Sequence, residues 1–256
     1  MTPTLTPTPT LSIVMITMAS RARLRAIVLD QLLAQARPFG NDVEFVLGLD
    51  ADDTTITYDD AAKIQTSGVT YRAVRGTWPT VAQKQNATIG ATRGRWVTLW
   101  DDDDWSAPDR LAKTFEAIAT TGGDLIGVER IHYHELTSPD RRTVEFTTPA
   151  VIVDGLATFR RKLWEAAPFE VKSRYSDVGD WIVQRTRAGA TVRTTVVDYV
   201  AMIHGTNATR ARPFRVDPVN GEVFDGPREF KLVGGRDATA AIVGDATLVQ
   251  YEAAVV

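Results

Sequence analysis

Strand and helix patterns alternate along the first half of the chain. Residues 11–18, 43–49 and 96–100 are runs of almost wholly apolar side chains, which is typical of strands covered on both faces. Between these runs, residues 21–35 and 80–92 place apolar side chains at helical spacing. Alternating strands and helices predict an α/β fold of the doubly wound type, with a mostly parallel central sheet and helices on both of its faces.

The pattern also predicts the domain organisation. Residues 1–10 alternate Thr and Pro, which favours a short disordered arm, and residues 11–210 then form a single domain. Residues 211–256 form a C-terminal extension, packed on the domain or flexible, which can include a hairpin around Asn220-Gly221. The other expected strands are 69–74, 124–132, 144–153 and 191–200, and the other expected helices are 58–66, 108–120, 156–167 and 177–188.

Composition excludes several classes of site. The chain has 29 Lys and Arg against 32 Asp and Glu, so its net charge of −3 gives no reason to expect a general nucleic-acid-binding protein. The absence of cysteine excludes disulfides and thiolate chemistry, and it favours a cytoplasmic location. No window reaches about 18 uninterrupted apolar residues, so we expect no transmembrane segment.

Four consecutive carboxylates, Asp101 to Asp104, follow the strand at 96–100. Adjacent like charges repel one another and cannot all be buried without a positive partner. Oxygen ligands favour Mn²⁺ or Mg²⁺, so a divalent cation is the simplest candidate. The alternative is a solvated acidic turn that caps the helix beginning near Pro108.

Polar residues also follow two other strands of the predicted sheet. The carboxyl ends of parallel strands meet in one crevice, where carboxylates can hold the ribose and base of a nucleotide. Neither the fingerprint GxGxxG nor a P-loop motif occurs, so phosphate charge has to be balanced by a metal and by side chains. The residues after the first strand are Thr17, Ala19, Ser20 and Arg21, and those after the second are Asp50, Asp52 and Asp53.

Six stretches occur in order over residues 12–210. They are SIVMITMASR, FVLGLDADDTT, QKQNATIGATRGRWVTLWDDDDW, GLATFRRKLWEAAPFE, SDVGDWIVQRTRAG and YVAMIHGTNATR. Together they resemble glycosyltransferase family 2, the inverting nucleotide-sugar-dependent transferases of the GT-A fold. The resemblance implies a hexosyltransferase-like enzyme that moves a sugar from a nucleotide sugar, with UDP favoured, to an acceptor hydroxyl. The acceptor, whether a glycan, a protein, a small molecule or modified nucleic acid, stays open.

The resemblance assigns roles to individual residues. Asp103 holds Mn²⁺ or Mg²⁺ with His204 and Asp101, and a register that uses Asp102 and Asp104 stays open. The catalytic base is Asp180, because the aromatic residue after it matches the family pattern, and Asp177 is the alternative. The residues implied in nucleotide binding are Thr17, Ala19, Ser20, Arg21, Asp50, Asp52, Asp53, Lys84, Asn86, Asp101 and Asp102, and those implied on the acceptor side are Asp104, Trp105 and Trp181.

Several of these residues also have a simpler structural interpretation. Lys84 and Asn86 can belong to an ordinary polar helix face, and most tryptophans are expected in the core. His132 and His134 share one face of a strand and can ligate a metal, but a polar strand face explains them better. Two other functions stay open: a nucleotidyltransferase-like enzyme, and a non-catalytic nucleotide- or sugar-binding module of the same fold.

Overall fold

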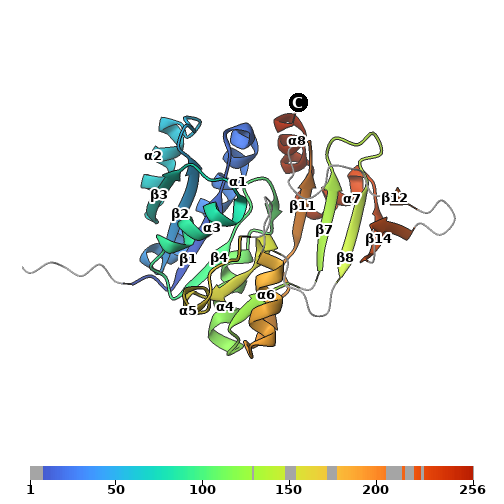
Figure 1. Cartoon of the computed structure of the whole chain (residues 1–256). Helices are drawn as coiled ribbons and strands as arrows, with labels where there is room; N and C mark the ends of the chain where they lie inside the picture. The colour runs from blue at the N-terminus through green and yellow to red at the C-terminus, as the bar shows by residue number, and fades with distance from the viewer. Residues whose placement is uncertain are drawn as a thin grey trace, which may run out of the picture.

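The structure is a computed structural model that describes residues 8–128, 130–147, 154–171, 178–205, 215–216, 222–225 and 228–255. Its central sheet has the strand order β10-β6-β9-β4-β1-β2-β3, of which β1 to β4 are labelled in Figure 1. The pairs β1–β2, β1–β4, β2–β3 and β6–β10 are parallel, and only β9 runs antiparallel to its neighbours. The mostly parallel sheet is therefore confirmed. Its strands are β1 (Leu11–Ile16), β2 (Val43–Asp50), β3 (Thr70–Gly76), β4 (Trp96–Leu99), β6 (Leu125–Gly127), β9 (Thr158–Arg160) and β10 (Val192–Thr194).

Helices cover both faces of this sheet because alternate side chains of its strands are buried on opposite sides. In β1, Ile13 and Met15 pack in the same core cluster as the apolar face of α1, whereas Val14 packs with Ile89 of α3 in a second cluster. The first face carries α1, α2 and α4, and the second carries α3, α5 and α6. The helices are α1 (Ala22–Ala36), α2 (Tyr58–Thr66), α3 (Val81–Gly90), α4 (Arg110–Thr120), α5 (Arg161–Ala166) and α6 (Val178–Arg187).

A second sheet has the order β12-β13-β14-β8-β7-β11-β5, and β7 and β8 stand away from the central sheet in Figure 1. The C-terminal helices α7 (Arg236–Val243) and α8 (Asp245–Ala254) pack against it and against α1. Leu248 and Tyr251 of α8 are completely buried, so this segment is part of the core. The strands are β5 (Trp105–Ser106), β7 (Arg130–Glu135), β8 (Thr143–Thr147), β11 (Tyr199–Ile203), β12 (Arg215–Val216), β13 (Glu222–Asp225) and β14 (Arg228–Gly234).

Three expected elements are divided differently in the structure. Residues 124–132 hold β6 and the start of β7, which belong to different sheets, and residues 191–200 likewise hold β10 and the start of β11. Residues 156–167 begin as β9 before α5 starts, because the segment pairs with β4. The antiparallel pair β12–β13 lies where a hairpin was expected, although its Asn220-Gly221 turn is outside the described residues.

The last residues of the arm expected over residues 1–10 make hydrogen bonds to neighbouring segments. The carbonyl oxygens of Pro9 and Thr10 accept hydrogen bonds from Arg95 and Trp96, and the Thr10 N–H donates to Asp42. Proline lacks an N–H but keeps its carbonyl acceptor, so the segment can extend β1 between its two neighbours. Residues 1–7 lie outside the described residues. None of the described helices is long and apolar enough to cross a membrane.

Candidate functional site

The acidic turn Asp101–Asp104 lies at the carboxyl end of β4. Asp102 is 1% exposed, Asp103 4% and Asp104 8%, and only Asp101 is half-buried. The helix α4 begins at Arg110, and no side chain of the turn caps it. The alternative of a solvated, helix-capping turn is therefore wrong, and these charges need partners inside the protein.

Arg21 and His204 supply two of these partners. One guanidinium nitrogen of Arg21, Nη1, lies 2.8 Å from Asp102 Oδ1 and 2.9 Å from Asp103 Oδ2. His204 Nε2 lies 3.0 Å from the same Asp103 Oδ2. Burial and the charge of Asp103 raise the pKa of Asp102 to about 6, against the opposing effect of Arg21. The predicted metal ligands Asp103 and His204 are thus brought together, with Arg21 beside them.

Asp101 and Asp104 are held by the strand β11. The Tyr199 hydroxyl lies 2.7 Å from Asp101 Oδ2 and 2.5 Å from Asp104 Oδ2. The backbone N–H of Met202 donates to Asp104 Oδ1 at 2.7 Å. Burial, with the charges of Asp103 and Asp101, raises the pKa of Asp104 well above its usual range. Because its carboxyl oxygens are occupied by these internal contacts, Asp104 supports the turn, and this weighs against the register that gives Asp104 to the metal.

Sequence reasoning missed Arg110 and Gly155 beneath the turn. Arg110 is 2% exposed and donates to the carbonyl oxygens of Leu99 at 2.6 Å and Gly155 at 3.0 Å. Burial lowers the pKa of Arg110 to about 10. A Cβ atom on Gly155 would lie 1.5 Å from Asp101 Oδ2, so only glycine allows this approach. Arg110 follows the acidic run closely and Gly155 opens the stretch GLATFRRKLWEAAPFE, but nothing in the sequence indicated that either residue lies against the acidic turn.

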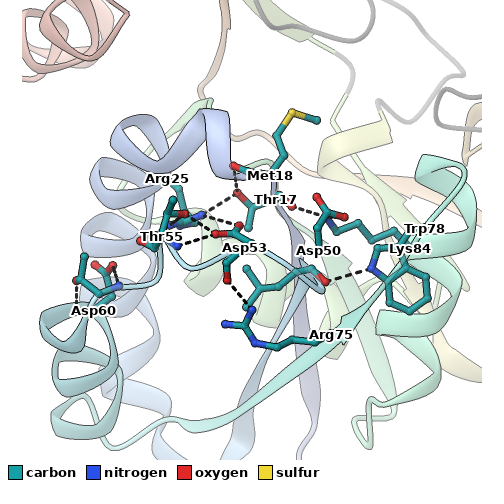
Figure 2. A network of polar contacts seen from close by, with 12 residues as sticks. Thr17, Met18, Arg25, Asp50, Asp53, Thr55, Asp60, Arg75, Trp78 and Lys84 are labelled. Carbon is teal, nitrogen blue, oxygen red and sulfur yellow. Dashed lines mark hydrogen bonds and ion pairs between the residues drawn. The ribbon is translucent and has the colours of Figure 1, made fainter.

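A second group of polar residues lies at the ends of β1 and β2. Figure 2 shows Lys84 of α3 extending to both strands, where its Nζ donates to Asp50 Oδ1 at 2.8 Å and to the Thr17 carbonyl oxygen. Lys84 is 7% exposed, whereas the Asp50 carboxylate is about one-third exposed. The carboxyl ends of β1 and β2 therefore lie close together, as expected, and Lys84 orients the carboxylate of Asp50.

The carboxylate of Asp53 makes its contacts mainly within its own loop. Its Oδ1 accepts hydrogen bonds from the backbone N–H and hydroxyl of Thr55 at 2.8 and 2.6 Å, and Arg25 lies 3.6 Å from its Oδ2 (Figure 2). Burial alone would raise the pKa of Asp53, but the Thr55 hydrogen bonds and the charges of Arg25 and Arg75 outweigh it and hold the pKa below its usual value. These contacts give Asp53 a structural role in its loop, and its expected role in nucleotide binding stays a prediction. The neighbouring predicted residues Ala19, Ser20 and Asp52 are exposed.

Three other predicted site residues make contacts inside the protein. Asn86 Oδ1 accepts from the indole of Trp164 at 2.8 Å and the backbone of Phe169 at 3.0 Å, and its Nδ2 donates to the Phe169 carbonyl at 2.8 Å. Trp181 is 2% exposed and packs against the rings of Phe169 and Phe159, and Trp105 is 7% exposed in the main core. These contacts give each residue a structural role, and the expected contacts with nucleotide or acceptor stay predictions.

The candidate base Asp180 has none of these contacts. Asp180 is exposed in the first turn of α6, next to the buried Trp181 that anchors this helix, and Asp177 lies outside the described residues.

The two strand histidines, His132 and His134, contact groups other than the acidic turn. His134 Nδ1 lies 3.1 Å from the Thr143 hydroxyl, and His132 Nε2 lies 3.5 Å from Glu145.

The side chains at the acidic turn are of the types that bind a divalent cation. Asp102, Asp103 and His204 offer buried carboxylate and imidazole ligands, and Asp102 Oδ2 is buried with no hydrogen-bond partner among the described residues. Within the same residues, no three such side chains are already arranged to hold a metal ion.

Comparison with known proteins places this arrangement among sugar transferases. Succinoglycan biosynthesis protein ExoO of Rhizobium meliloti (strain 1021) is 38% identical over 66 residues, which are 26% of this chain and 18% of ExoO. The structure of S. aureus TarS 1–349 in complex with UDP matches with a TM-score of 0.58 at 12% identity, covering 76% of this chain and 61% of TarS 1–349.

Mannosyltransferase PcManGT from Pyrobaculum calidifontis in complex with GDP-Man and Mn²⁺ matches with a TM-score of 0.56 at 17% identity, covering 76% of this chain and 57% of that protein. The chain spans less than two thirds of the length of each of these three proteins. These solved structures share its GT-A fold. The model of the family described as Glycosyl transferase family 2 matches residues 12–175, so this chain belongs to glycosyltransferase family 2.

Proposed function

We propose that this protein transfers a sugar from a nucleoside diphosphate sugar to an acceptor hydroxyl, with inversion at the anomeric carbon. The observation that carries the proposal is the convergence of Asp102, Asp103, Arg21 and His204 at the carboxyl edge of the central sheet. This edge is where open α/β sheets bind nucleotides. Membership of family 2 supports the same reaction class.

The donor lies between the ends of β1, β2 and β4. The carboxylate of Asp50, oriented by Lys84, accepts hydrogen bonds from N–H or hydroxyl groups of the nucleoside. Asp101 faces the ribose. UDP is favoured, with GDP as the alternative, since TarS has been solved with UDP and UDP-GlcNAc and PcManGT with GDP-Man. Asp50 is the residue on which base discrimination depends most directly.

Asp103 and His204 hold the divalent cation, with Asp102 completing the acidic side of its site. When bound, Mn²⁺ or Mg²⁺ neutralises charge on the departing diphosphate. The Mn²⁺ of the PcManGT complex supports a metal in this fold, and the buried Asp102 Oδ2 supports it in this chain.

Asp180 is the general base, with Asp177 as the alternative. Its carboxylate takes the proton of the acceptor hydroxyl while the acceptor oxygen bonds to the anomeric carbon. The bond from that carbon to the diphosphate oxygen breaks at the same time, and the electron pair leaves with the nucleoside diphosphate. One displacement on the face opposite the leaving group gives inversion. The exposed position of Asp180 suits a group that meets an incoming acceptor.

Calorimetric titration of UDP, GDP and dTDP, with and without Mn²⁺, tests the donor site. We expect one nucleotide to bind in a metal-dependent way and the binding to be lost in Asp103→Asn. Asp109→Asn is the matched control, because Asp109 is exposed and pairs only with Lys113 among the contacts found for it. Absence of binding by all three nucleotides to the folded protein would refute the assigned site.

Turnover distinguishes an enzyme from a binding module. Release of nucleoside diphosphate from a panel of UDP- and GDP-sugars, with water or added sugars as acceptor, should fall by at least about a hundredfold in Asp180→Asn, the range given by general base catalysis. Nucleotide affinity should stay unchanged in this variant. Binding without turnover in the wild-type protein would instead favour the binding module.

A further inference from the structure

Arg21 occupies the space between the two most deeply buried carboxylates of the acidic turn. A single nitrogen, Nη1, contacts Asp102 Oδ1 and Asp103 Oδ2, at 2.8 and 2.9 Å. The Arg21 side chain is 14% exposed, and the two carboxylate side chains are 2% and 5% exposed. A buried ion pair with little solvent screening is a strong local interaction, so this guanidinium is the counter-charge that allows the turn to be buried.

The same contacts already occupy the carboxylate oxygens that we propose as metal ligands. Asp103 Oδ2 is shared by Arg21 Nη1 and by His204 Nε2, which lies 3.0 Å away. A divalent cation that used the facing oxygens of Asp102 and Asp103 would lie where Nη1 lies now. Two positive charges at one position repel strongly in a buried site, so the guanidinium and the metal exclude each other.

We propose that Arg21 is a built-in counter-cation that a divalent metal displaces, and that the released guanidinium then becomes available to the anionic diphosphate of the donor. The inference rests on the proposed metal-assisted function and adds a regulation of the same site. Arg21 belongs to the short turn Ala19–Arg21 after β1, whose other two residues are exposed. Metal loading and diphosphate binding are thereby coupled through one side chain.

The wild-type protein tests this displacement by arginine labelling. Phenylglyoxal modification is followed by peptide mass spectrometry, with and without Mn²⁺ at a saturating concentration, at constant ionic strength. We expect Mn²⁺ to increase the labelling of Arg21 several-fold and to leave Arg23, which is exposed two residues later, unchanged. Unchanged or reduced labelling of Arg21 at saturating Mn²⁺ would overturn the proposal.

Titration of Mn²⁺ alone into Arg21→Met gives a second measurement that does not depend on turnover. Met keeps much of the apolar stem and removes the competing charge, so the Kd for Mn²⁺ should tighten by about tenfold or more, the equivalent of one charge-assisted hydrogen bond. Arg23→Met should leave the Kd unchanged. An unchanged or weaker Kd in Arg21→Met would overturn the proposal, as would a failure of both wild type and variant to bind Mn²⁺.

The two measurements also distinguish this proposal from the proposed function. If Mn²⁺ displaces Arg21 and the protein transfers no sugar, the counter-cation proposal stands and the transferase proposal fails. If sugar transfer occurs and Arg21 labelling does not respond to bound Mn²⁺, the reverse holds. Should Arg21→Met not fold, the wild-type labelling decides alone.

Discussion

Tyr199→Phe removes the hydroxyl that joins two carboxyl groups of the acidic turn. The phenol oxygen lies 2.7 Å from Asp101 Oδ2 and 2.5 Å from Asp104 Oδ2. A phenol has one proton, so both contacts are hydrogen bonds only when one of the two carboxyl groups is protonated. This agrees with burial raising the pKa of both Asp101 and Asp104. The variant should therefore leave two buried acidic groups without this partner.

The expected loss of stability follows from this geometry. Phenylalanine keeps the ring of Tyr199, which is 2% exposed, so the apolar burial is unchanged. A hydrogen bond to the charged carboxylate contributes roughly 1.5–3 kcal/mol, and one with the protonated carboxyl group contributes about 1 kcal/mol. We expect the free energy of unfolding to fall by about 3 kcal/mol, which corresponds to a Tm lower by roughly 6–12 °C in a chain of this size.

Urea unfolding followed by tryptophan fluorescence and circular dichroism at pH 7 measures the loss. Tyr58→Phe is the matched control, because Tyr58 is 90% exposed, and it should change the free energy of unfolding by less than about 0.5 kcal/mol. A loss below about 1 kcal/mol in Tyr199→Phe, with an unchanged m value, would show that the hydroxyl does not support the turn.

Three further predictions test other parts of the structure. Asn86→Ala removes three hydrogen bonds of a structural clamp and should lower the free energy of unfolding by about 2–3 kcal/mol in urea, with nucleotide affinity by calorimetry unchanged once the protein is folded. Burial lowers the pKa of His134 to about 4, so neutral His134 contributes stability above pH 6.5 that is lost as the pH falls toward 4. His134→Gln should remove about 2.5 kcal/mol of the stability difference between pH 7.5 and 4.5. Gly155→Ala should displace Asp101 and abolish metal-dependent nucleotide binding, whereas Gly90→Ala should be neutral or stabilising in thermal unfolding, because its Cβ meets only one atom at 3.6 Å.

Each of these predictions has a result that contradicts it. An Asn86→Ala protein of full stability that binds nucleotide poorly would return Asn86 to the donor site. Equal pH dependence of wild type and His134→Gln would show that His134 is not the group whose protonation is coupled to unfolding. Tight nucleotide binding by Gly155→Ala would mean that Asp101 can move without loss of the site.

The sequence predicted the central sheet well because buried parallel strands are continuous apolar runs. β1 and β4 each fall within a run of this kind, β2 exceeds its run only by Asp50, and the carboxylates at the ends of β2 and β4 lie at the expected edge. The second sheet was harder to predict, because its strands come from residues 105 to 234 and pair across long separations. Its short strands, such as β5 with two residues, carry too little pattern to be separated from their neighbours.

For the site, the sequence supplied the residue types and the structure supplied their partners. Asp103 and His204 were paired only through the family resemblance, and they lie in contact. The contacts of Asn86 with Trp164 and Phe169 could not be predicted, because an amide in a motif can bind a ligand or tie two segments together. The role of Arg21 as a counter-charge to the acidic turn was also beyond the sequence, because its partners are about 80 residues away in the chain.

The acidic turn depends on the whole fold for its geometry. Four adjacent carboxylates destabilise one another, so the turn cannot be ordered by local contacts alone. Its partners come from distant parts of the chain: Arg21 is separated from Asp102 by 81 residues, and Tyr251 donates to the Asp104 carbonyl at 3.1 Å across 147 residues. Since Tyr251 lies in α8 and is completely buried, α8 supports the same turn that Arg21, just before α1, neutralises in part. Substitutions in α8, far from the proposed donor, are therefore expected to act on metal and nucleotide binding through the acidic turn.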